Sequence, residues 1–281
     1  MKIFERSGDL EFFLDSCRKD NKAVSLVPTM GGLHDGHLSL VEKAQSLADV
    51  VVVSIFVNPT QFAKGEDFDS YPKTFSNDKF LLEERGIDVL FIPSKDEIYP
   101  NGTLSNYDVG EIGRLLCGFS RPFHFNGVAQ VVNRLFDIVK PNYSIFGEKD
   151  YQQLLIIKSL VKNNNLNVSI ESVSTQREDD GLAMSTRNKY LGTKDRMKAP
   201  LFYQQLINAK TAIEQGNPIE FVTQKALSEL SVNFEVEYFE VLNANNLTQI
   251  ATNTAEIIII SAIRLGETRL IDNIVFRRSN V

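Results

Sequence analysis

Short apolar runs alternate with stretches of helical apolar spacing along the first part of the chain, up to about residue 176. Gly, Pro and Asn bound the apolar runs, which predict buried strands at 23–27, 51–57, 89–92, 143–146 and 168–173. Helices are predicted between them at 10–17, 40–48, 74–85, 128–139 and 154–161, with Ser7 or Asp9 capping the first. Strands and helices in strict alternation are typical of an α/β fold with a doubly wound parallel sheet.

The pattern changes after Lys194. Two long helical stretches, 194–215 and 218–232, are followed by β-rich runs at 234–241, 257–263 and 269–276. Turn residues separate the last three runs, which predicts an antiparallel meander. We therefore expect two domains, residues 1–176 with the parallel sheet and residues 177–281 as a smaller α+β domain.

The stretch VPTMGGLHDGH places His34 and His37 in a glycine-rich turn between a predicted strand and a predicted helix. In a parallel α/β sheet, such a turn lies at the carboxyl edge of the strands, where ligands bind. A helix N-terminus offers free N–H groups and the positive end of a dipole, so the expected ligand is a phosphate. The alternative is that both histidines are polar residues that cap a turn.

Other polar clusters also follow predicted strands. Asn58 and Gln61 follow the second strand as amides suited to a hydroxyl or a carboxylate, although Asn58 equally suits a turn before Pro59. Arg121 and His124 follow a glycine-containing stretch, residues 94–120, that we interpret as an excursion from the sheet or a lid, and both can face an anion.

Two further clusters carry cationic side chains. Lys149, in the sequence Gly147-Glu148-Lys149-Asp150, is a candidate phosphate ligand, with Asp150 as a possible helix cap and Gln153 one turn further on. Met184-Ser185-Thr186-Arg187 lies on a polar loop expected to be mobile, where Arg187 can donate to two phosphate oxygens; the alternative is a polar interdomain linker. In the part of the chain that alternates strand and helix, every one of these clusters lies after a predicted strand, which favours one composite site.

Composition narrows the class of protein. A net charge of −6 argues against broad nucleic-acid binding, which needs a basic surface. Cys17 and Cys117 lack a CxxC partner, which indicates neither a zinc site nor a disulfide framework and fits the cytoplasm. With no signal-peptide pattern and no apolar run of membrane-spanning length, we expect a cytoplasmic protein without membrane or nucleic-acid partners.

An ordered set of motifs resembles the pantoate–β-alanine ligases, also called pantothenate synthetases. The matching stretches span nearly the whole chain and read VPTMGGLHDGH, VVVSIFVNPTQF, YPKT, IYPNGT, SRPFHFNGV, FGEKDYQQL, DGLAMSTRN and RLIDN. The resemblance implies a Rossmann-like N-terminal domain of the nucleotidyltransferase type, which binds ATP and pantoate, and a C-terminal lid domain. It also implies ATP-dependent condensation of pantoate with β-alanine through a pantoyl adenylate, with Mg²⁺ and a cytoplasmic homodimer.

The same resemblance implies roles for individual residues. His37, His34, Lys149 and Arg187 would be catalytic, with His37 as proton donor. The implied ATP-binding residues are Met30, Gly31, Gly32, Leu33, His34, Asp35, Gly36, His37, Gly147, Glu148, Lys149, Asp150, Gln176, Met184, Ser185, Thr186 and Arg187. Gln61 and Gln153 would bind pantoate, and Gln61 β-alanine as well; metal ligands are not assigned.

The sequence departs from the family pattern at three positions. Phe123 stands where many members have glycine, Gln176 where an aliphatic residue is usual, and Thr186 where serine is common. Two alternative functions remain at this point. A nucleotidyltransferase acting on a phosphate would favour more Arg and Lys than the amides Gln61 and Gln153. A non-catalytic nucleotide-binding module would not need both histidines together with Lys149 and Arg187.

Overall fold

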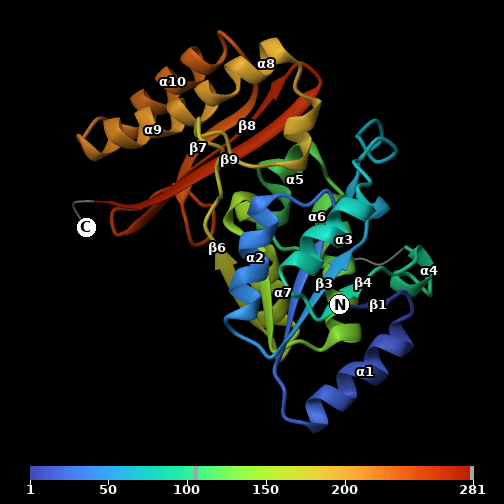
Figure 1. Ribbon diagram of the computed structural model, residues 1–281. Helices are drawn as coiled ribbons and strands as arrows, with labels where there is room; N and C mark the ends of the chain where they lie inside the picture. Colours follow the sequence, from blue (N-terminus) through green and yellow to red (C-terminus); the bar gives the residue numbers. More distant parts are fainter. Residues whose placement is uncertain (104–106, 279–281) are drawn as a thin grey trace. The chain divides into compact units, whose positions relative to one another are not determined.

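The structure, a computed structural model, describes residues 1–103 and 107–278. These residues form two compact units (Figure 1). The first contains residues 1–148 and 153–174, and the second contains residues 149–152 and the chain from residue 175 onward. That the predicted segments 1–176 and 177–281 are functional domains stays a prediction.

The first unit is built on a six-stranded sheet in the order β1-β4-β3-β2-β5-β6, in which all paired strands are parallel. Its strands are β1 (Lys2–Phe4), β2 (Val24–Thr29), β3 (Val50–Ile55), β4 (Val89–Phe91), β5 (Tyr143–Gly147) and β6 (Ser169–Val173). The strand order reverses between β2 and β5, so the chain leaves these two neighbours in opposite directions. That switch point is where doubly wound sheets bind ligands.

Alternating residues of each strand face opposite sides of this sheet. Val52 packs in an apolar cluster with α1, α6 and α7, whereas Val53 packs in a second cluster with α2 and α3. Figure 1 shows these helices around the sheet. They are α1 (Ser7–Lys19), α2 (Asp35–Gln45), α3 (Phe75–Glu84), α6 (His124–Val139) and α7 (Tyr151–Asn163). The predicted doubly wound α/β fold is confirmed.

Several local predictions were wrong. The first helix is capped neither by Ser7 nor by Asp9: its N-cap residue is Arg6, and Glu97 accepts the N–H of Ser7 at 2.8 Å. The helix expected to reach residue 48 ends at Gln45, where the chain tightens into a turn. Strand β1 was not predicted, because three residues that pair with β4 alone give no periodic signal.

The stretch expected to be a lid contains short helical turns. They are α4 (Lys95–Ile98), η2 (Ile112–Arg114) and α5 (Cys117–Ser120), and η1 (Pro59–Gln61) follows β3 earlier in the chain. Residues 104–106 of this stretch lie outside the described residues. A lid function for this stretch stays a prediction.

The second unit contains the antiparallel sheet β7-β8-β9 that the sequence predicted. Its elements are η4 (Thr186–Tyr190), α8 (Thr193–Lys198), α9 (Pro200–Glu214), α10 (Ile219–Leu230), β7 (Glu235–Asn243), β8 (Glu256–Leu265) and β9 (Thr268–Arg277). The first predicted helix is divided in two, because Pro200 begins α9 and cannot continue the preceding turn. Helices α9 and α10 share an apolar core with the sheet.

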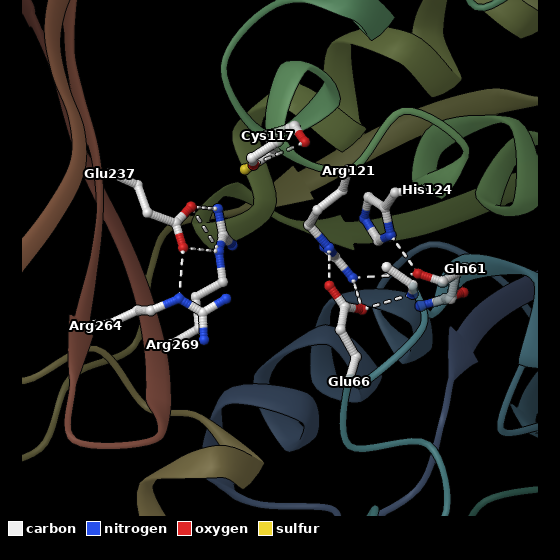
Figure 2. A network of polar contacts seen from close by, with 10 residues as sticks. Gln61, Glu66, Cys117, Arg121, His124, Glu237, Arg264 and Arg269 are labelled. Carbon is white, nitrogen blue, oxygen red and sulfur yellow. Dashed lines mark hydrogen bonds and ion pairs between the residues drawn. The ribbon is translucent and has the colours of Figure 1, made fainter.

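One carboxylate links the three strands of this sheet. Glu237 of β7 pairs with Arg264 of β8 at 3.3 Å and with Arg269 of β9 at 2.9 Å, as Figure 2 shows. These ion pairs add side-chain links to the main-chain hydrogen bonds of the sheet, and they favour the observed register of its strands.

Candidate active site

The turn after β2 is held by a buried carboxylate that the sequence analysis missed. Gly31 and Gly32 adopt φ angles of +82° and +67°, a left-handed conformation that favours glycine. Asp78, on α3, accepts the N–H groups of Gly32 and Leu33 at 2.9 Å each and the hydroxyl of Thr74 at 3.0 Å. It is 1% exposed. In the sequence, Asp78 reads as a polar residue of an ordinary helix, so no local signal marked it.

This arrangement also explains why glycine is required at position 31. A Cβ atom there would lie 3.1 Å from a carboxylate oxygen of Asp78 and 3.1 Å from Ile55. A side chain would therefore push against the carboxylate that holds the turn, in addition to the backbone strain.

The two histidines lie together at the N-terminus of α2. Their ring centroids are 4.2 Å apart, and both side chains are half-buried. His34 is the N-cap residue, and its Nδ1 accepts the N–H of Gly36 at 3.1 Å. A ring nitrogen that accepts this bond carries no proton, so neutral His34 holds its proton on Nε2. His37 lies in the first turn of the helix, not in the preceding loop as expected; Asp35 and Gly36 complete that turn.

Asn58 is held within the protein by hydrogen bonds at both ends of its amide. Its side chain is 1% exposed, and its Oδ1 accepts the N–H and hydroxyl of Thr60 and the hydroxyl of Tyr99. Its amide nitrogen donates to Gln61 Oε1 at 3.0 Å and to the carbonyl of Gly127 at 3.1 Å. Burial raises the pKa of Tyr99 to about 12, so the phenol stays protonated and donates. Asn58 thus orients the side chain of Gln61.

Gln61 is also tied to the glycine-rich turn. Its Nε2 lies 3.1 Å from the sulfur of Met30, the first residue after β2. Because β2 and β3 are neighbours in the sheet, Gln61 and Met30 follow adjacent strands. The structure thereby brings Gln61 into contact with the histidine-bearing segment.

Arg121 and His124 hold the main chain of Gln61 (Figure 2). Arg121 donates to the carbonyl of Gln61 at 3.1 Å, and Nδ1 of His124 donates to the same oxygen at 2.7 Å. Arg121 also forms a two-pronged ion pair with Glu66, at 2.5 and 2.7 Å. Burial raises the pKa of Glu66, but the hydrogen bond and charge of Arg121 outweigh it and the net shift is downward. The side chains of Arg121 and His124, expected on an anion, contact protein groups here, and Phe123 beside them is exposed.

Predicted site residues after β5 belong to both units. Gly147 and Glu148 end the first segment of the first unit, and the hydroxyl of Ser172 donates to Glu148 at 2.8 Å. Gln153 is half-buried in the first turn of α7. Lys149 and Asp150 belong to the second unit, where the side-chain amide of Asn273 donates to the carbonyl of Lys149 at 3.0 Å.

The remaining predicted residues form a hairpin-like segment in the second unit. Gln176 accepts the N–H of Met184 at 2.9 Å, and Arg177 bridges to Ala183. Ser185 caps η4 by accepting the N–H of Arg187 at 3.2 Å, and the neighbouring Thr186 is buried.

This segment, expected to be mobile, is anchored at several points. Arg196 pairs with Glu178 and Asp180 at 2.6 Å each, and the amide of Asn188 donates to Glu178 at 2.7 Å. Neither Arg196 nor Asn188 was identified from the sequence.

The described residues contain no preformed set of side-chain ligands for a metal ion. Across residues 1–103 and 107–278, no three His, Cys, Asp or Glu side chains are grouped so that they can hold one. None of the helices in the described part of the chain is long and apolar enough to cross a membrane.

Comparisons with known proteins agree along the whole chain. The sequence profile of the family described as pantoate-beta-alanine ligase matches residues 2–275. A pantothenate synthetase of Vesicomyosocius okutanii is 49% identical over 280 residues, covering 100% of this chain and 99% of that protein. One of Acinetobacter baumannii is 47% identical over 265 residues, covering 93% of each.

Solved structures show the same fold. A crystal structure of pantothenate synthetase from Thermus thermophilus has a TM-score of 0.91 at 40% identity, covering 98% of this chain and 99% of that one. The pantoate-beta-alanine ligase of Francisella tularensis, complexed with beta-gamma ATP and β-alanine, has a TM-score of 0.83 at 38% identity, covering 98% and 97%. The chain belongs to the pantoate–β-alanine ligase family.

Proposed function

We propose that this protein condenses (R)-pantoate with β-alanine at the expense of ATP, giving pantothenate, AMP and diphosphate. A carboxylate oxygen of pantoate attacks the α-phosphorus, and diphosphate leaves. The amine of β-alanine then attacks the carbonyl carbon of the pantoyl adenylate, releases AMP and loses a proton. Family membership along the whole chain, together with the histidine pair at the sheet's switch point, supports this reaction.

The first step builds negative charge on the phosphate oxygens and the leaving group, so it needs positioned donors and positive charge. The N-terminus of α2 supplies main-chain N–H groups. The Nε2–H group of His34 donates a hydrogen bond to a phosphate oxygen. His37 acts as the proton donor. Met30–Gly36 pack against ATP, and Gly147 and Glu148 flank the nucleotide from the end of β5.

In the second unit, Lys149 and Arg187 neutralise the phosphate oxygens, and Asp150, Gln176 and Met184–Thr186 complete the ATP site. The amides of Gln61 and Gln153 bind pantoate, and Gln61 also binds β-alanine. Gln61 suits this role because Asn58 fixes its side chain and Arg121 and His124 fix its carbonyl.

Magnesium arrives with ATP in this proposal. Mg²⁺ commonly keeps several waters and is held through substrate phosphates, so the absence of a grouped ligand set among the described residues fits this mode of binding. No protein ligand is assigned to it. We also propose that the protein acts in the cytoplasm as a homodimer.

The test is pantoate-dependent exchange of labelled pyrophosphate into ATP, with magnesium and without β-alanine. Exchange is expected, because the adenylation step is reversible, and addition of β-alanine should then yield AMP and pantothenate. AMP formation with β-alanine but no exchange would overturn the stepwise mechanism. Folded protein that binds ATP but shows neither activity would overturn the ligase function.

A further inference from the structure

A buried ion pair links strand β9 to the start of the 176–187 segment. Arg177 donates to both carboxylate oxygens of Asp272, at 2.7 and 2.9 Å. The side chain of Asp272 is 1% exposed and that of Arg177 is 18% exposed. The guanidinium also stacks on the ring of Tyr203, 3.6 Å from its centroid. A two-pronged pair that is also stacked has a single well-defined geometry.

The same pair fixes the turn that precedes the proposed ATP-binding loop. Arg177 donates to the carbonyl of Gly181 at 3.1 Å, which closes the turn between Gln176 and Met184. Gly181 has a φ angle of +91°, and a Cβ there would lie 2.6 Å from Tyr203. The ring that stacks on Arg177 therefore also requires glycine at the turn.

The neighbouring residue on β9 reaches Lys149. Asn273 is 5% exposed, and its side-chain amide donates to the main-chain carbonyl of Lys149 at 3.0 Å. Its own carbonyl accepts from Arg177 at 3.4 Å, and its N–H donates to Asp272 at 2.7 Å. One three-residue cluster, Arg177-Asp272-Asn273, thus contacts both the lysine segment and the 176–187 segment.

The charge of Lys149 acts on the same cluster. Burial raises the pKa of Asp272, while the hydrogen bonds and charge of Arg177, and the charge of Lys149, oppose that rise. The charge of Lys149 therefore acts on Asp272, and the main-chain carbonyl of Lys149 contacts Asn273.

We propose that Asn273 is a positioning residue, which sets Lys149 in place relative to the segment that bears Arg187, so that both cations meet the phosphates of ATP together. This inference rests on the proposed function, because it assumes that Lys149 and Arg187 bind ATP. Strand β9 is the common support: it carries Asn273 and Asp272, and it packs against η4, where Arg187 lies.

The first experiment compares Asn273→Ala with Ser261→Ala. Ser261, on β8 opposite Asp272, is also buried and donates to a main-chain carbonyl, that of Tyr238, at 2.8 Å. Each variant loses a buried hydrogen bond from a side chain of this sheet to a main-chain carbonyl, so thermal unfolding should change similarly. The Kd for ATP, measured by calorimetry, should rise about tenfold in Asn273→Ala and stay unchanged in Ser261→Ala.

The second experiment repeats Asn273→Ala in a Lys149→Ala background. If Asn273 acts through the lysine, the double variant should bind ATP no more weakly than Lys149→Ala alone. A purely structural role would instead weaken binding in both backgrounds by the same factor. If Asn273→Ala does not fold, Asn273→Asp keeps the shape and replaces the donor with an acceptor, and the same pattern is expected.

Three outcomes separate the possibilities. Non-additivity with Lys149 supports the proposal. Equal ATP affinities for Asn273→Ala and Ser261→Ala, or additive losses, would overturn it while wild-type pyrophosphate exchange remains intact. Failure of wild-type exchange would instead count against the proposed function itself.

Discussion

The two groups of proposed ATP-binding residues are held by different forces. In the first unit, the turn of Gly31 and Gly32 is held through main-chain N–H groups that meet one carboxylate, Asp78. In the second unit, Lys149 and the 176–187 segment are held by a buried ion pair and an amide on β9. The first group depends on backbone conformation, and the second on packed side chains.

This difference has a consequence for what each group tolerates. A left-handed glycine turn has few substitutes, because other residues are strained there whatever they contact. A buried ion pair is sensitive to substitution for another reason, since removal of one partner leaves the other as an uncompensated buried charge. Loss of the two histidines that the first turn carries should affect mainly catalysis, whereas loss of the buried ion pair should affect mainly stability.

The largest expected effect is on catalysis in the first unit. Replacing both His34 and His37 with alanine should lower the rate of pantoate-dependent exchange about 10³-fold, because donors to the developing charge are lost. Stability should fall by only about 1 kcal/mol, the usual value of an N-cap. His124→Ala is the control: it removes an imidazole that contacts Gln61, and we expect about a tenfold loss. Near-normal turnover in the folded double variant would refute the assignment.

The next effect is on stability in the second unit. Asp272→Ala should lower the free energy of unfolding by about 3 kcal/mol, measured by urea denaturation, because Arg177 loses its buried partner. The value falls at the low end because Arg177 stays partly exposed and stacked on Tyr203.

The matched control is Glu256→Gln. Its pair with Arg277 is 3.8 Å long and exposed, and it should contribute about 0–1 kcal/mol. If Asp272→Ala and Glu256→Gln lower the free energy of unfolding by the same amount, the buried ion pair is not what stabilises the second unit.

A third variant tests whether main-chain hydrogen bonds set the catalytic geometry. Asp78→Asn keeps the shape of the side chain but replaces one acceptor oxygen with an NH₂ group that faces a main-chain N–H donor. The free energy of unfolding should therefore fall by about 2 kcal/mol. The kcat should fall about tenfold, because the turn bearing His34 is displaced. Thr74→Val removes only the hydroxyl that Asp78 accepts, and should leave kcat near its normal value. Equal kcat losses in the two variants would argue against a main-chain role for Asp78.

The smallest effect concerns the ion pair beside Gln61. The pKa of Glu66 is lowered from its ordinary 4.5, so the pair stabilises the folded state above pH 4.5 and loses that contribution as the pH falls through the folded-state pKa. Glu66→Gln should cost about 1 kcal/mol at neutral pH. Its free energy of unfolding should also fall less steeply than that of wild type below pH 4.5, as measured by urea titrations. Parallel pH curves would contradict this.

Much of the fold was predictable because parallel strands that are buried on both faces have continuous apolar sequences. Val50–Ile55 is such a run, and its neighbours repeat the pattern. The position of the histidine segment followed from the glycines that interrupt one run. Helix ends were harder to predict. Glu97 takes the place of a local cap at the start of α1, and no sequence signal near Ser7 indicates this distant partner.

The sequence by itself determined the strands other than β1, the turns that follow them and the residues that match the family's motifs. Only the tertiary structure decided what holds those turns. Asp78 and Gly32 are 46 residues apart, and Asn273 and Lys149 are 124 apart. Periodicity reports which face of an element is buried, but not which buried group it meets. Such pairs become visible only when packing brings distant segments within hydrogen-bond distance.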